Sequence, residues 1–182
     1  MLISTKPTVA AAGLALCVML NATSAHADGA LAKINIRLSG TVVALGCTVN
    51  PADVDKPVDL GEWATKNMKK AGQTTRQVPF AIHLTGCTAS GVTTVFTGTK
   101  DKIMPELLAL KNDGADCAAG VAVQIMDSAG KLIPMGDNAP RGVVDENGNL
   151  TFSFRANYVA TGDDTVRPGA ADADTVFTLT YD

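Results

Sequence analysis

The sequence predicts an all-β fold in which two sheets pack as a sandwich. Several segments alternate apolar and polar residues with a period of two, which is typical of strands that bury one face. Turn residues separate these segments at intervals typical of a sandwich, among them Asn147-Gly148 and residues 127–130. No long segment has the apolar period of an amphipathic helix, so helical and mixed folds are not expected.

The first 27 residues have the features of a secretion signal. Lys6 supplies a positive charge, and residues 8–20 form an apolar stretch that is short for a bilayer span. Ala25-His26-Ala27 is a small-x-small cleavage site, so residues 1–27 are predicted to be a signal peptide. No later segment is long and apolar enough to span a bilayer, so no direct membrane insertion of the mature chain is expected.

Cleavage would leave 182 − 27 = 155 residues, the size of one ordinary domain. Lys6 is the one charged residue in the lost segment, so 15 − 1 = 14 Lys and Arg would face 18 Asp and Glu, a formal charge of −4. No basic run is present, so the sequence predicts no nucleic-acid partner.

The predicted strands follow one another through the mature chain. Residues 105–111 begin with a proline and are expected to form one or two helical turns. Residues 161–174 are rich in Asp, Gly and Ala and are expected to form a loop. The strands are predicted at residues 34–43, 58–60, 78–84, 92–96, 121–125, 150–159 and 175–181.

Both ends of the mature chain have strongly patterned strands. Near the end of the chain, Phe177, Leu179 and Tyr181 alternate with polar residues. Near the start, large branched residues from Ile34 to Leu38 share one face. An exposed edge of that kind favours aggregation, so this strand needs a groove. The sequence leaves open whether the groove belongs to its own domain or to a neighbouring chain.

Export to an oxidising compartment makes the cysteines informative. The mature chain has Cys47, Cys87 and Cys117, which allow one bridge in three possible pairings. Cys47 and Cys87 have similar surroundings, because each follows a glycine at the end of an apolar alternating run. Cys117 shares its parity with the apolar residues of 121–125, which predicts a buried free thiol. An intermolecular bridge through Cys117 is the alternative.

The sequence shows no catalytic or metal-binding constellation. His83 is the single histidine after residue 27, and its parity places it on the polar face of its strand, without a nucleophile and acid to work with. Asp145 begins a spacing that resembles a calcium loop, but Leu150 and Ala156 occupy the glycine and glutamate positions. We therefore expect no enzymatic activity, no metal and no cofactor.

The order and spacing of short motifs resemble those of pilins of the chaperone–usher pathway, close to the subunits of type 1 fimbriae. The resemblance covers the whole mature chain and begins with Gly40, seven residues before Cys47. The further matching elements are Gly46-Cys47-Thr48-Val49, a second cysteine 40 positions on, Val58-Asp59-Leu60-Gly61, residues 72–87 with Val78-Pro79-Phe80-Ala81-Ile82, Phe96-Thr97-Gly98, Leu108-Ala109-Leu110, residues 120–125, Gly169 and the penultimate Tyr181.

The resemblance implies an incomplete immunoglobulin-like β-sandwich that is completed by a donor strand from another subunit. Residues 28–43 would be the N-terminal donor-strand extension, and residues 44–182 the pilin domain. A Cys47–Cys87 disulfide would brace the domain. The groove-filling residues of the donor strand would be Ile34, Ile36, Leu38, Gly40 and Val42. The C-terminal groove edge and chaperone contact would comprise Gly169, Phe177, Leu179 and Tyr181.

The resemblance also implies partners and a location. A periplasmic chaperone would lend a strand to each subunit until assembly. At the outer-membrane usher, the N-terminal extension of the next subunit would replace that strand, so neighbouring fimbrial subunits are also partners. The protein would pass through the periplasm to the cell surface and act in adhesion as part of a fimbria. Cys117 departs from the two-cysteine pattern, and the motifs fit a major rod subunit as well as an adaptor. The alternative is a self-contained secreted immunoglobulin-like binding module whose residues 28–43 fold onto their own domain.

Overall fold

The computed structural model describes residues 46–111 and 114–182, which belong to a compact unit spanning Val42–Asp182. The predicted strand at residues 34–43 lies outside the described residues. In the part of the chain that is described, strands predominate, and the helical elements are two short ones, α1 (Pro51–Val54) and η1 (Thr65–Asn67). None of the described helices has the length and apolarity needed to cross a membrane.

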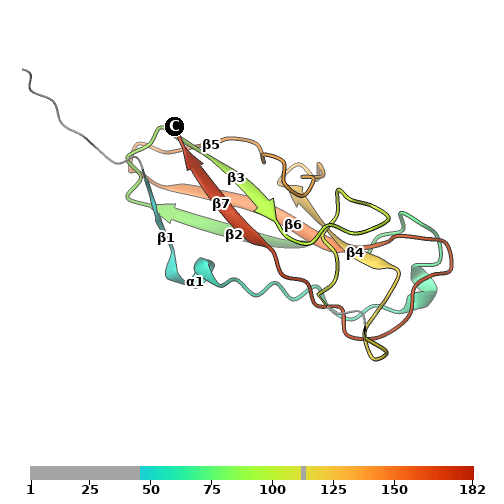
Figure 1. Cartoon of the computed structure of the whole chain (residues 1–182). Helices are drawn as coiled ribbons and strands as arrows, with labels where there is room; N and C mark the ends of the chain where they lie inside the picture. Colours follow the sequence, from blue (N-terminus) through green and yellow to red (C-terminus); the bar gives the residue numbers. More distant parts are fainter. Residues whose placement is uncertain (1–45, 112–113) are drawn as a thin grey trace, which may run out of the picture. The chain divides into compact units, whose positions relative to one another are not determined.

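The strands form two antiparallel sheets, so the prediction of an all-β fold is confirmed. Figure 1 shows β3 and β7 of the second sheet lying across β2 and β6 of the first. The first sheet has the order β1 (Thr48–Val49), β2 (Val78–Thr85), β6 (Leu150–Ala160) and β4 (Val121–Asp127). The second sheet has the order β5 (Gly142–Val143), β3 (Gly91–Thr97) and β7 (Val176–Tyr181).

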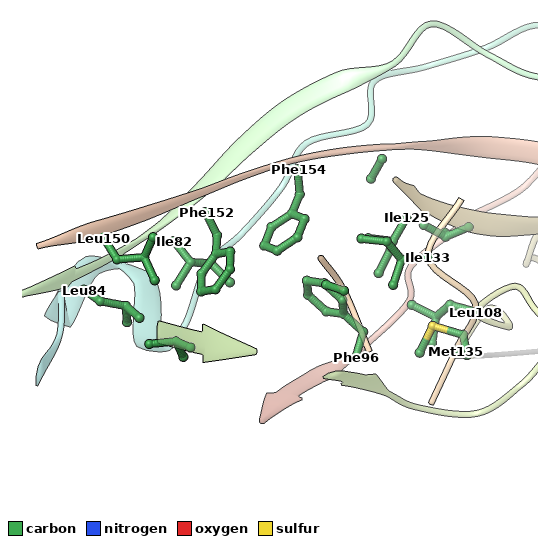
Figure 2. Packing of buried hydrophobic residues seen from close by; sticks show 14 residues of the cluster. Ile82, Leu84, Phe96, Leu108, Ile125, Ile133, Met135, Leu150, Phe152 and Phe154 are labelled. Carbon is green, nitrogen blue, oxygen red and sulfur yellow. The ribbon is translucent and has the colours of Figure 1, made fainter. Parts of the chain in front are cut away.

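The core lies between the two sheets, where alternate residues of each strand point inward. Figure 2 shows Phe152 and Phe154 projecting from β6 toward Phe96 of the other sheet. The rings of Phe96 and Phe154 meet edge to face with centroids 4.9 Å apart, a favourable aromatic geometry. The sandwich is therefore joined by direct side-chain packing across the layers.

Three local predictions were wrong. Residues 58–60 are not a strand, and they have no ladder partner among the described residues. Residues 105–111 are not helical: a single turn joins Met104 to Leu107, and Leu108 then bridges to Val123 and to Lys100. The turn predicted at Asn147-Gly148 is centred one residue earlier, because the Gly148 amide donates to the Asp145 carbonyl at 3.0 Å, and the strands on either side, β5 and β6, belong to different sheets rather than forming one hairpin ladder.

Candidate functional site

The candidate site is the free edge of the second sheet, which is formed by β7. β7 is last in the order β5-β3-β7, and in the described part of the chain its one ladder partner is β3. Figure 1 shows β7 in red beside β3. An edge strand of this kind presents unpaired backbone groups on the side away from its partner.

The register shows which backbone groups face that edge. Gly91 of β3 and Asp182 donate their amides to each other's carbonyls at 3.1 Å, so they form a hydrogen-bonded pair. Such pairs alternate along an antiparallel ladder, so Thr180 and Thr178 also direct their amides and carbonyls toward β3. The amides and carbonyls of the intervening residues therefore point toward the open edge. These residues are Phe177, Leu179 and Tyr181.

The same three residues form the inward face of β7, and their side chains are only half-buried. They pack against the main core cluster, whereas Val92, Thr94 and Phe96, their register partners on β3, are almost completely buried. The inner face of β7 is thus apolar and in contact with the core but incompletely covered. An unpaired backbone edge and an incompletely covered apolar face coincide on one strand.

A second unpaired segment contacts the same core. Val58 and Leu60 are half-buried and Asp59 between them is exposed, which is the burial pattern of a strand. Leu60 packs against the same cluster as Phe177 and the other inward residues of β7. Residues 58–60 therefore have the alternating burial of a strand. No other described segment pairs with them in a ladder.

The start of the domain is held at four points. Cys47 and Cys87 form a disulfide, and β1 pairs with the end of β2. After β1, the Asn50 amide donates to the His83 carbonyl of β2, and α1 begins. Asp53 of α1 provides the fourth attachment.

The Asp53 carboxylate is buried and has its partners at hydrogen-bond distance. One oxygen accepts from the His83 backbone amide at 2.8 Å and lies 2.7 Å from His83 Nδ1, and the other is 2.5 Å from Lys56 Nζ. The Lys56 ammonium and the His83 amide lower the pKa of Asp53 from 3.8 to about 2, against the opposing effect of burial. His83 lies on the exposed face as predicted, and its ring serves to hold α1. We did not predict the role of Asp53 from the sequence.

The remaining predicted residues lie elsewhere. Gly169 is separate from β7: its backbone passes so close to residues 116–118 that a Cβ would lie 2.3 Å from the Cys117 carbonyl carbon. Cys117 is a free thiol, but it is half-buried rather than buried. It precedes β4, so the parity of that strand does not extend to it.

The five donor-strand residues from Ile34 to Val42 lie outside the described residues. Within the described ranges, no group of three His, Cys, Asp or Glu side chains is placed to hold a metal ion.

Comparisons with known proteins assign the fold and the family. A family model described as "Fimbrial protein" matches residues 36–182, so the chain belongs to the fimbrial protein family. Over 165 residues it is 36% identical to the Fimbrial-like protein FimF of Salmonella typhimurium, covering 91% of this chain and 93% of that protein. It is also 36% identical to a Type-1 fimbrial protein, A chain, of Escherichia coli, covering 89% of this chain and 91% of that protein.

Solved structures of pilins have the same fold. A Burkholderia pseudomallei antigen and type I fimbria protein is 34% identical, with a TM-score of 0.58 over 76% of this chain and 91% of that chain. The P pilus rod subunit PapA is 19% identical, with a TM-score of 0.63 over 75% of this chain and 99% of that chain, and supports the fold alone. The fold is therefore the immunoglobulin-like sandwich of pilins. The chain is a structural subunit of a surface fimbria and not an enzyme.

Proposed function

We propose that this subunit polymerises by donor-strand exchange, in which residues 28–43 of one copy or of a related subunit add to the free edge of β7 in the next. The single observation that carries the proposal is the coincidence of an unpaired edge and a half-buried apolar face at Phe177, Leu179 and Tyr181. An added strand would supply backbone partners for these residues and cover their side chains.

The chemistry of residues 28–43 fits that role. Ile34, Ile36 and Leu38 share one face with Gly40 and Val42, and the alternate positions are mostly polar. Burying each large aliphatic side chain contributes roughly 1.5–3 kcal/mol, so the joint gains stability along its whole length. Gly40 allows a close backbone approach at one position. Residues 58–60 would pair with the other side of the added strand, and the packing of Leu60 against the same core cluster as β7 supports this.

The donor and acceptor surfaces differ, so the contact is head-to-tail and extends into a filament. Before assembly, β7 would need a temporary partner, because its exposed edge promotes aggregation. We propose that a periplasmic chaperone covers this edge and that an outer-membrane usher exchanges it for the next subunit. The assembled fibre then contributes to cell adhesion.

Two full-length variants test the mechanism when they are mixed. Ile36→Asp should be unable to donate its strand, and Leu179→Asp should be unable to accept one, so each alone should remain monomeric. A mixture should give a dimer and no longer species, because only one pairing remains. Arg37→Asp, on the opposite face of the donor strand, is the matched control and should polymerise. Size-exclusion chromatography separates these outcomes. A wild-type protein that stays monomeric in the same assay would support a self-contained binding module instead.

A further inference from the structure

A side chain crosses the second sheet at the end where β7 finishes. Arg141 immediately precedes β5, and its side chain reaches over the start of β3 to Asp182, which follows β7. Its Nε donates to Asp182 Oδ2 at 2.9 Å, and its Nη2 donates to Ser90 Oγ at 3.1 Å. The Ser90 hydroxyl in turn donates to the Asp182 carbonyl at 3.1 Å. One guanidinium therefore connects the residues that flank β5, β3 and β7 at this end of the sheet.

Gly91 provides the path for this side chain. It has the parity of the outward residues of β3, yet it is buried. A Cβ at this position would lie 2.0 Å from Arg141 Cζ and 2.1 Å from Nη2, and the three nearest heavy atoms all belong to the Arg141 guanidinium. Any larger residue would displace the guanidinium. The glycine and the arginine are thus fitted to each other.

We propose that Arg141 is a positioning residue, a strap that holds the end of β7 in register and so controls how long an added strand stays bound there. The inference rests on the proposed function, because it concerns strand capture at the same edge. Strand ends fray unless they are tied down. The strap is attached at Asp182, which follows Tyr181 at one end of the free edge of β7. A single exposed ion pair does little, but this one is joined to Ser90 and to the backbone of Asp182.

A double-mutant cycle between Gly91→Ala and Arg141→Ala tests the strap. All proteins are full-length and carry Ile36→Asp, so that they do not add to one another. The first measurement is hydrogen–deuterium exchange of residues 176–182, and the second is the dissociation rate of a labelled synthetic peptide of residues 30–43. Each single substitution should raise both rates about fivefold, the change that loss of an exposed ion-pair network allows.

The decisive result is the double variant. Without Arg141 an alanine at position 91 meets no guanidinium, so the double variant should match Arg141→Ala alone. Arg155→Ala, which removes a surface arginine from the other sheet, is the control and should change neither rate. Two outcomes would overturn the strap. One is a double variant whose rates rise by the product of the two single effects, and the other is an unchanged hydrogen–deuterium exchange rate in Arg141→Ala. If the reference protein binds no peptide, donor-strand exchange and the role of Arg141 in strand capture both fail. The hydrogen–deuterium exchange rates of the four proteins then still decide whether Arg141 orders β7.

Discussion

At the scale of single residues, the attachment of α1 depends on the Asp53 carboxylate. It accepts the His83 amide of β2 and pairs with Lys56, so it holds the segment after β1 against the first sheet. Removing the carboxylate would leave the His83 backbone amide without its acceptor, which is costly, whereas the partly exposed Lys56 ammonium can turn to water.

We therefore expect Asp53→Ala to lower the free energy of unfolding by about 1–3 kcal/mol. Urea denaturation at neutral pH measures it. Asp55→Ala is the matched control, because Asp55 is an exposed acid two residues away and its loss should change stability little. Equal effects of the two substitutions would show that the Asp53 contacts do not stabilise the domain.

The pH dependence of the same pair of proteins gives a separate prediction. The pKa of Asp53 is about 2 in the folded protein and 3.8 ordinarily, so its contribution is complete above about pH 4 and is lost as the pH falls through 2. Because its partners are partly exposed, we discount this contribution to about 1 kcal/mol. The difference in stability between wild type and Asp53→Ala should shrink by that amount between pH 5 and pH 2. A difference that stays constant would contradict the assigned ionisation.

The residues that sequence inspection missed share a physical cause. Asp53 reaches a partner 30 positions away and Arg141 one 41 positions away, and local patterns carry no information about such pairs. His83 was placed on the correct face, because parity along a strand is a local property. Its partner could not be named without the fold.

At the scale of elements, β7 exposes every second backbone amide to the open edge. A proline at position 179 would remove one of these outward amides and leave the ladder to β3 intact. We expect Leu179→Pro to keep the fold but to weaken capture of a peptide of residues 30–43 by about 1–3 kcal/mol relative to Leu179→Ala, which keeps the amide. Isothermal titration compares the two. Equal affinities would mean that the edge of β7 does not pair with the peptide.

The strands that were predicted correctly have clear alternation, and each has a ladder partner in one of the two sheets. β2, β3, β4, β6 and β7 all appear within one or two residues of the predicted bounds. Residues 58–60 have the alternation but no ladder partner within 46–111 and 114–182, and a strand requires a partner as well as a pattern. The predicted helical turns at 105–111 failed because Leu108 pairs with Val123, a contact that local sequence does not encode.

At the scale of the whole molecule, the Cys47–Cys87 disulfide ties the start of the domain to the end of β2 across 40 positions. A loop of that length is worth up to about 4 kcal/mol in the chain-entropy model. Replacing both cysteines with alanine should lower the free energy of unfolding by about 2–4 kcal/mol, measured by urea denaturation. Cys117→Ala is the control and should cost less, because that thiol is half-buried and unbridged. A double variant as stable as wild type would contradict the bracing role.

The most direct test of the central claim uses residues 44–182 alone, a segment that lies within the compact unit Val42–Asp182. Its melting temperature is measured with a saturating peptide of residues 30–43 and with the same peptide carrying Ile36→Asp. Donor-strand completion predicts a rise of about 10 °C with the native peptide, as expected for tight binding to the folded state, and little change with the variant. Identical melting temperatures with either peptide and without peptide would show that the sandwich is already complete and would contradict donor-strand exchange.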